Sequence, residues 1–161
     1  MKTNQSDKSK GPGVYFPPPL FYAFTFSVAI FIHKRIQFGD TFFRMKATKG
    51  FGIIFLISAL FFLFRSLRQF FLTKNTVILI KPATSLQTTG IYSLTRNPMY
   101  LGLALLYLGL TCFFGNWWNI ILFPLLILLV QEFIIKPEEK YLEHEFGIDY
   151  EKYSSKVRRW L

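Results

Sequence analysis

The chain alternates between apolar segments and shorter polar or basic connections. The apolar segments cover residues 15–32, 50–64, 98–114 and 117–135. A membrane-spanning helix needs about 20 predominantly apolar residues, and each segment comes near or up to that length. The pattern therefore predicts four transmembrane helices, of which the first is only just long enough.

The connections indicate how these helices are joined. The uncharged turn at residues 115–116 predicts a helical hairpin of the third and fourth segments, followed by two tryptophans that are typical of a membrane interface. Lysine and arginine counts place this turn outside, and residues 65–96 and 136–161 inside. The basic connection 33–49 then falls outside, against the rule, so it lies flat in the interface or the first two spans have other bounds.

The remaining segments complete the expected fold. Residues 1–14 form a polar tail, and residues 15–161 are expected to form a single membrane domain. Residues 76–82 have the composition of a strand but no partner, so we expect an extended loop at the interface. Pro137, followed by two glutamates, predicts the start of a further helix, and Gly147 its end. The expected fold is an all-α integral membrane protein with about four transmembrane helices and a helical C-terminal cytoplasmic segment.

The composition supports a membrane protein and argues against other classes. Hydrophobic residues make up 52% of the 161 residues, and the net charge is +10. The basic residues flank the apolar segments, so we expect contacts with anionic lipid headgroups and no nucleic acid partner. Cys112 is the only cysteine, which excludes an intrachain disulfide and a cysteine zinc site. His33 and His144 lack the spacing of metal ligands, so no metal is expected.

Candidate chemistry begins at the start of the third segment. Arg96 and Asn97 come directly before Pro98, a residue that suits the first turn of a helix. Asn97 is then a natural N-cap. A guanidinium, an amide and the partial positive charge of a helix N-terminus would meet at the membrane surface. This combination can hold an anionic or zwitterionic small molecule.

Acidic residues follow the fourth segment. An antiparallel hairpin would bring Glu132, Glu138 and Glu139 to the same side of the membrane as Arg96. Donors for a carboxylate and carboxylates for an ammonium group are what a free amino acid moiety needs. Nearby aromatic residues could receive a flat ring or a sulfonium cation: Tyr92, Tyr100, Tyr141 and Phe146.

The two polar regions together resemble a known signature. The first half reads Gly90-x-Tyr92-x3-Arg96-Asn97-Pro98-x-Tyr100-x-Gly102. The second half reads Glu138-Glu139-x2-Leu142-x3-Phe146-Gly147-x2-Tyr150-x2-Tyr153-x3-Val157. Both halves are similar to the membrane methyltransferases of the isoprenylcysteine carboxyl methyltransferase and phospholipid methyltransferase group.

The resemblance implies S-adenosylmethionine as methyl donor, held by the last two spans and the residues after them. Gly102 and Gly109 would permit close approach of the donor, and Lys156 would orient an anionic acceptor. Asn97 departs from the histidine of many relatives and cannot titrate, which argues against a proton relay there. The candidate catalytic residues are Arg96, Glu138 and Lys156, and the candidate donor-binding residues are Tyr92, Arg96, Asn97, Tyr100, Gly102, Gly109, Glu138 and Glu139.

The expected function is methyl transfer to a lipophilic acceptor, namely a carboxylate of an isoprenylcysteine-like molecule, at the cytoplasmic side of the inner membrane. Alternatives are N-methylation of a phospholipid amine, a nicotinamide-dependent membrane reductase and a non-catalytic membrane adaptor. An amine acceptor would need a base, for which Glu132 or Glu138 is a candidate. Structural roles are the alternatives at several positions: Gly102 and Gly109 can serve helix packing, and Glu132 can pair with Lys136.

Overall fold

The computed structural model describes residues 17–72 and 85–161, and within these ranges the protein is all-helical. The elements are α1 (Pro18–His33), α2 (Thr41–Arg44), α3 (Lys46–Leu72), the 3-10 turn η1 (Gly90–Ser93), α4 (Pro98–Phe114), α5 (Trp117–Val130), the π-helical turn η2 (Gln131–Ile135), α6 (Lys136–Phe146) and α7 (Ile148–Ser154). The predictions for the tail at 1–14 and the loop at 76–82 lie outside the described residues.

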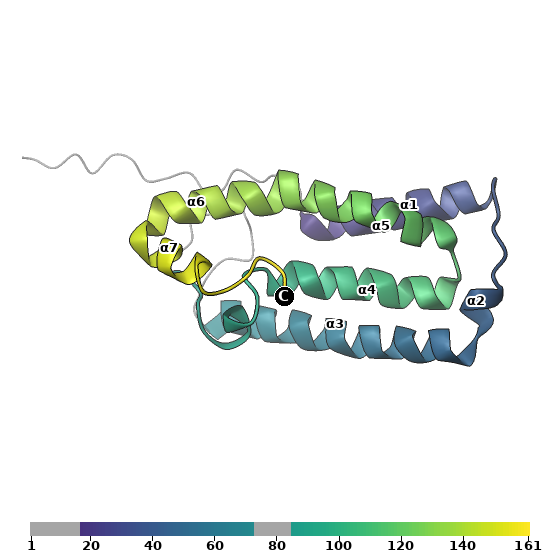
Figure 1. The fold of residues 1–161 in the computed structure, drawn as a ribbon, viewed down its shortest axis with the longest axis horizontal. Coiled ribbons are helices and arrows are strands. Elements are labelled where there is room, and N and C mark those ends of the chain that lie inside the picture. The colour runs from purple at the N-terminus through teal and green to yellow at the C-terminus, as the bar shows by residue number, and fades with distance from the viewer. Residues whose placement is uncertain (1–16, 73–84) are drawn as a thin grey trace, which may run out of the picture.

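The long helices run side by side along the long axis of the molecule (Figure 1). α4 packs mainly against α3, and α5 packs mainly against α1. Helix α2 lies at one end of the bundle, and α7 with the last residues lies at the other (Figure 1). The start of α4 and the whole of α6 therefore belong to the same end as α7.

Glycines on α4 let α3 come close. A Cβ added to Gly109 would lie 2.7 Å from Leu56 Cδ2, and one added to Gly102 would lie 2.8 Å from Leu63 Cγ. Small residues at such positions allow two helix backbones to approach. Both glycines therefore face α3, which favours the packing alternative over contact with a ligand.

Large side chains fill the space between the two pairs of helices. Tyr107 stacks on Phe123 with ring centroids 5.7 Å apart, and Tyr22 donates a hydrogen bond of 3.1 Å to the carbonyl of Tyr100. The buried cluster consists of Tyr22, Tyr100, Leu103, Ala104, Tyr107, Leu126, Val130, Ile134 and Ile135. This core holds the two pairs together beside the start of α4.

The outer surface of α3 is apolar. Its exposed large hydrophobic side chains include Phe51, Ile53, Ile54, Ile57, Leu60, Phe61 and Phe64. A surface of this kind would be unfavourable in water and suits a lipid environment. By length and composition, Lys46–Gln69 and Trp117–Phe146 are candidate membrane spans, and Pro18–His33 and Pro98–Phe114 are shorter apolar helices. Four complete spans therefore stay a prediction.

Two of the predicted boundaries are wrong. Helix α3 extends beyond the predicted segment 50–64 at both ends. The helix of the fourth segment does not end at residue 135, because Ile135 has helical dihedral angles (φ −68°, ψ −48°) and the chain continues into α6. The π-helical turn lies just before Pro137, whose ring would clash with an earlier carbonyl in a regular helix. Gly147 ends α6 with a positive φ of 49°, as predicted.

The connection 33–49 packs against the turn of the hairpin. Trp117 Nε1 donates to the carbonyl of Gly39 (2.9 Å), and Trp118 Nε1 donates to that of Ile36 (2.8 Å). Phe43 is buried against Gly115, the left-handed residue that ends α4. This end of the bundle is therefore closed by aromatic side chains, and the charged residues of the candidate site lie at the other.

Candidate functional site

The two polar regions of the sequence meet at the end of the bundle where α4 begins. Arg96 Nη1 lies 3.3 Å from Glu139 Oε1. The hydroxyl of Tyr100, four residues after Arg96 and within α4, donates a hydrogen bond of 2.6 Å to Glu138 Oε2. The guanidinium and the acidic pair are thus brought together, with Glu139 next to Arg96 and Glu138 next to Tyr100.

The start of α4 is fixed by neighbours far along the chain. Pro98 occupies the first turn and Asn97 precedes it, but the side chain of Asn97 does not cap the helix. Its Nδ2 instead donates to the carbonyl of Arg159 at 3.0 Å. Thr95 Oγ1 donates to the same carbonyl at 3.0 Å and accepts the N–H of Asn97. Asn97 thus occupies the predicted N-cap position, but its side chain makes no cap hydrogen bond and is used in a tertiary contact.

The acidic pair points in two directions. Consecutive residues of an α-helix are about 100° apart around its axis, so one carboxylate can face Tyr100 and the other Arg96. Glu139 also receives the guanidinium of Arg159, with Nε to Oε1 at 3.0 Å and Nη2 to Oε2 at 2.6 Å. This two-point geometry is among the stronger arrangements of a charged hydrogen bond. Glu138 is partly buried and bonds to a neutral hydroxyl instead.

Two tyrosines of α7 complete the site. The hydroxyl of Tyr150 accepts a hydrogen bond of 3.2 Å from Arg96 Nη1, and that of Tyr153 donates to the carbonyl of Tyr92 at 2.7 Å. Burial raises the pKa of Tyr150 to about 12, with a smaller contribution from the charge of Glu139. Burial raises the pKa of Tyr153 as well. Both hydroxyls therefore keep their protons at neutral pH and can act as donors.

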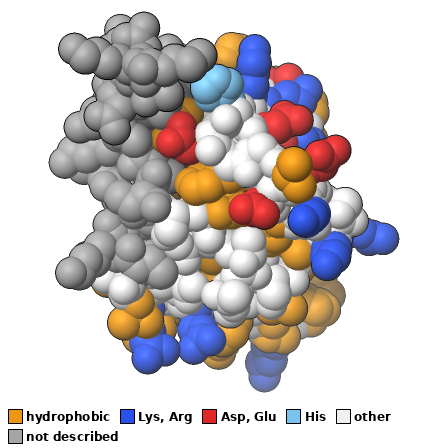
Figure 2. Space-filling model, turned by 90° about the vertical axis from the view of Figure 1, so that its left-hand side faces the viewer, with side chains coloured by type: hydrophobic (Ala, Val, Ile, Leu, Met, Phe, Trp, Pro, Cys, Tyr) orange, Lys and Arg blue, Asp and Glu red, His pale blue; other side chains and the backbone are white. Residues whose placement is uncertain are grey.

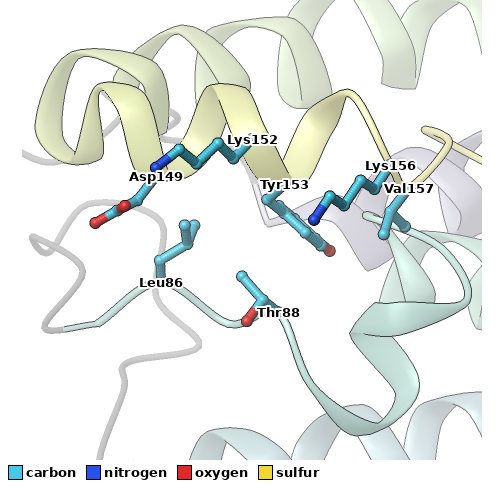
Figure 3. Close-up of a pocket in the computed structure, with 7 residues that line it drawn as sticks. All are labelled: Leu86, Thr88, Asp149, Lys152, Tyr153, Lys156 and Val157. Atoms are coloured by element: carbon cyan, nitrogen blue, oxygen red, sulfur yellow. The ribbon is translucent and has the colours of Figure 1, made fainter.

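Lys156 lies in a separate open pocket of about 480 Å³ (Figure 3). The pocket is lined by Leu86, Thr88, Asp149, Lys152, Tyr153, Lys156 and Val157. Tyr153 belongs to both places, since its ring lines the pocket and its hydroxyl bonds to Tyr92. Figure 2 views this end of the molecule, where basic and acidic side chains gather among hydrophobic ones.

Other predicted residues lie apart from these contacts. Glu132 pairs with Lys136 at 2.7 Å, and both side chains are about half exposed, which matches the ion-pair alternative. Gly102 and Gly109 face α3, as described above. Tyr141 and Phe146 are partly buried on α6.

Arg159 and Thr95 were not predicted as site residues from the sequence. Arg159 stands in a short basic stretch that resembles an ordinary contact with lipid headgroups, and Thr95 is a single polar residue in a turn. Tyr150 was part of the second half of the signature but was not among the candidate site residues. Its place in that signature, three residues after Gly147, was the available signal.

Three comparisons relate the chain to known proteins. The profile of the phospholipid methyltransferase family matches residues 45–149, which is more than half of the chain. A protein-S-isoprenylcysteine O-methyltransferase of Schizosaccharomyces pombe is 39% identical over 72 residues, covering 45% of this chain and 30% of that protein. An uncharacterized protein of Haemophilus influenzae is 47% identical over 66 residues, covering 39% of this chain and 100% of that protein. No solved structure matches.

Proposed function

Because the chain belongs to the phospholipid methyltransferase family, we propose that it transfers a methyl group from S-adenosylmethionine to a lipophilic acceptor at the membrane surface. The observation that carries this proposal is the meeting of Arg96 with the acidic pair at the start of α4. A guanidinium beside a carboxylate is the complement of an amino acid, and the methyl donor carries one.

The residues at this end fit the donor on two grounds. Arg96 Nε is buried and has no hydrogen-bond partner among the described residues, so the guanidinium retains a donor for a carboxylate. Glu138 accepts through Oε2 from Tyr100, and its other oxygen accepts nothing from the described part of the chain. That oxygen is available to an ammonium group. The N-terminus of α4 adds a partial positive charge next to Arg96.

When bound, the donor supplies an electrophilic methyl group on a positively charged sulfur. The chain then has to align that carbon with an acceptor atom, an effect that can be worth about 7–11 kcal/mol of the barrier. Arg96 and Glu138 fix the amino acid part of the donor from two sides. Tyr92, Tyr100 and Tyr150 line the same region and exclude water from it.

The acceptor we propose is the carboxylate of an isoprenylcysteine-like molecule. The pocket of Lys152 and Lys156 supports it, because its two ammonium groups outnumber the one carboxylate, that of Asp149. With the apolar Leu86 and Val157 in the same lining, this suits an anionic head on an apolar tail. A carboxylate is already nucleophilic and needs no general base. Asn97, which cannot titrate, supplies none.

A second candidate is N-methylation of a phospholipid amine. The family match favours it, since the name of the family refers to phospholipids. An amine acceptor must lose a proton, and Glu138 is the carboxylate placed to accept it. Methyl transfer from labelled donor to a total lipid extract, set against small prenyl thiol acids, distinguishes the two acceptors.

The first experiment is calorimetric binding of S-adenosylhomocysteine to the detergent-purified protein. Saturable binding is expected, and an excess of a nicotinamide dinucleotide should not displace the ligand. No binding at millimolar ligand would end the proposal. Preference for the dinucleotide would favour the membrane reductase, and binding of neither would favour the adaptor.

A further inference from the structure

Residues 157–161 are attached to the candidate site at several points. The backbone N–H of Arg96 donates to the carbonyl of Arg158 at 3.0 Å, and the carbonyl of Arg159 accepts from the side chains of Thr95 and Asn97. Trp160 Nε1 donates to Gln131 Oε1 at 3.3 Å. This segment is therefore built onto the start of α4 and onto η2, and the position of the Arg159 side chain is fixed from both sides.

With the Arg159 side chain in place, two guanidinium groups surround the single carboxylate of Glu139. Glu139 lies between Arg96, 3.3 Å away, and Arg159, which contacts both carboxylate oxygens. The side chains of Arg96 and Glu139 are each 15% exposed, so solvent screens their interaction only weakly. One carboxylate and two guanidinium groups leave one net positive charge. Without Arg159, the pair of Arg96 and Glu139 would be neutral.

The arrangement has a consequence for each glutamate. Both oxygens of Glu139 accept hydrogen bonds from Arg159, so this carboxylate is engaged within the protein. Glu138 has one hydroxyl partner and an oxygen to spare among the described residues. The two adjacent acids therefore differ in role: Glu138 faces a ligand, and Glu139 sets the charge of Arg96.

We propose that Arg159 is a positioning residue that occupies Glu139 and thereby leaves the charge of Arg96 for the carboxylate of an amino acid ligand. The inference rests on the proposed function, because it concerns the amino acid part of the methyl donor. Arg159 acts through Glu139 and Arg96. It thus selects ligands that carry this carboxylate over nucleosides that lack it.

The test compares two ligands on the full chain in detergent. S-adenosylhomocysteine carries the amino acid group, and 5′-methylthioadenosine lacks it. We expect Arg159→Gln to weaken binding of S-adenosylhomocysteine about tenfold, as for the loss of one charged interaction, and to leave 5′-methylthioadenosine binding within about twofold. Lys140→Gln is the matched control, because it removes the same charge from an exposed position beside Glu139 and should change neither affinity.

A double variant distinguishes an effect of Arg159 on the charge of Arg96 from support of the fold. In Arg159→Gln with Glu139→Gln, the competing carboxylate is removed together with its partner, and Arg96 regains its free charge. Binding of S-adenosylhomocysteine should return to within about threefold of wild type. If Arg159 only supported the fold, the double variant would bind no better than the single one.

The outcomes distinguish this inference from the proposed function. If the wild-type chain binds neither ligand, the proposed function fails. If it binds S-adenosylhomocysteine and Arg159→Gln binds it equally well, or loses both ligands alike, only the role of Arg159 is overturned. Should Arg159→Gln not fold, Arg159→Lys keeps the charge and should retain binding within about fivefold, whereas a larger loss would overturn the inference.

Discussion

Arg96 and Glu138 carry the proposed contact with the donor, and their neighbours make them suitable for mutation. Replacement of Arg96 by alanine leaves Glu139 paired with Arg159, so no buried charge is left without a partner. Replacement of Glu138 removes a carboxylate whose described partner is the hydroxyl of Tyr100. Both variants should therefore fold.

We expect Arg96→Ala and Glu138→Ala each to abolish measurable binding of S-adenosylhomocysteine. A hydrogen bond to a charged group is worth about 1.5–3 kcal/mol, and each variant also removes a charge that neutralises the ligand. Calorimetry measures the binding, and thermal unfolding in the same detergent checks the fold. Wild-type affinity in both variants would show that other residues hold the donor, and the assignment of Arg96 and Glu138 to it would be wrong.

The carbonyl of Arg159 gives a second prediction at this scale. It accepts from both Thr95 and Asn97, so either single variant, Thr95→Val or Asn97→Ala, leaves it one donor. Each should cost about 0.5–1.5 kcal/mol of stability. The double variant leaves this carbonyl without a side-chain donor and should cost more than the two single losses together. Simple additivity in thermal unfolding would contradict this account.

What the sequence could predict at the residue scale follows from distance along the chain. Arg96 and the acidic pair were found because helix starts and charged clusters are local features. The partner of Asn97 was not found, since its amide donates to a carbonyl 62 residues away. A local rule predicts the N-cap position, which the structure has, and only the tertiary fold supplies the carbonyl to which the Asn97 amide donates.

The contact of α3 with α4 determines where the start of α4 stands. Helices α4 and α5 follow one another along the chain, as the predicted hairpin requires. However, α4 packs mainly on α3 and only slightly on α5. The spacing of Gly102 and Gly109 indicated a close partner helix without indicating which one. The predicted end of the fourth helix at residue 135 was wrong for a related reason. The sequence around Pro137 resembles a helix start, but the π-helical turn lets the helix continue.

Substitution at this contact should destabilise the bundle. In Gly109→Val, the added Cβ would lie 2.7 Å from Leu56 Cδ2 and 3.2 Å from its backbone nitrogen, and a backbone contact cannot relax easily. We expect a loss of about 1–3 kcal/mol, measured as a lower unfolding temperature in detergent. Shortening the partner with Leu56→Ala in the same chain should recover part of the loss.

Gly50 offers the control for that experiment. It lies in the same helix pair, but an added Cβ there meets nothing within 4 Å. Gly50→Ala should therefore be neutral or stabilise α3 by up to about 1 kcal/mol, because glycine is a poor helix former. Equal destabilisation at both positions would show that helix–helix contact is not the cause.

At the scale of the whole molecule, the two ends differ in chemistry. One end is closed by aromatic side chains around α2, and the other carries the charged site and the pocket of Lys152 and Lys156. The sequence could predict that charges gather outside the apolar segments, but the connection 33–49 is basic as well, so it did not indicate which end carries the site. It could not predict that Lys156 lies in a pocket apart from Glu138, because that depends on the direction in which α7 turns back over η1.

This separation predicts that acceptor and donor affinities can be changed independently. Lys152 and Lys156 line the open pocket, whereas Arg96 and Glu138 are not among its lining residues. In Lys152→Gln with Lys156→Gln, the KM for an anionic acceptor should rise about tenfold, since each exposed ion pair is worth up to about 1 kcal/mol. Binding of S-adenosylhomocysteine should stay within about twofold.

Neutral acceptor analogues test whether the effect of the two lysines depends on the negative charge of the acceptor. A methyl ester or amide of the prenyl thiol acid lacks the negative charge, so the double variant should bind it as the wild type does in competition assays. Lys140→Gln removes a charge elsewhere on the same end and should leave the acceptor KM unchanged. If the lysine variants instead weakened donor and acceptor together, the two places would form one site, and the assignment of the pocket to the acceptor would be wrong.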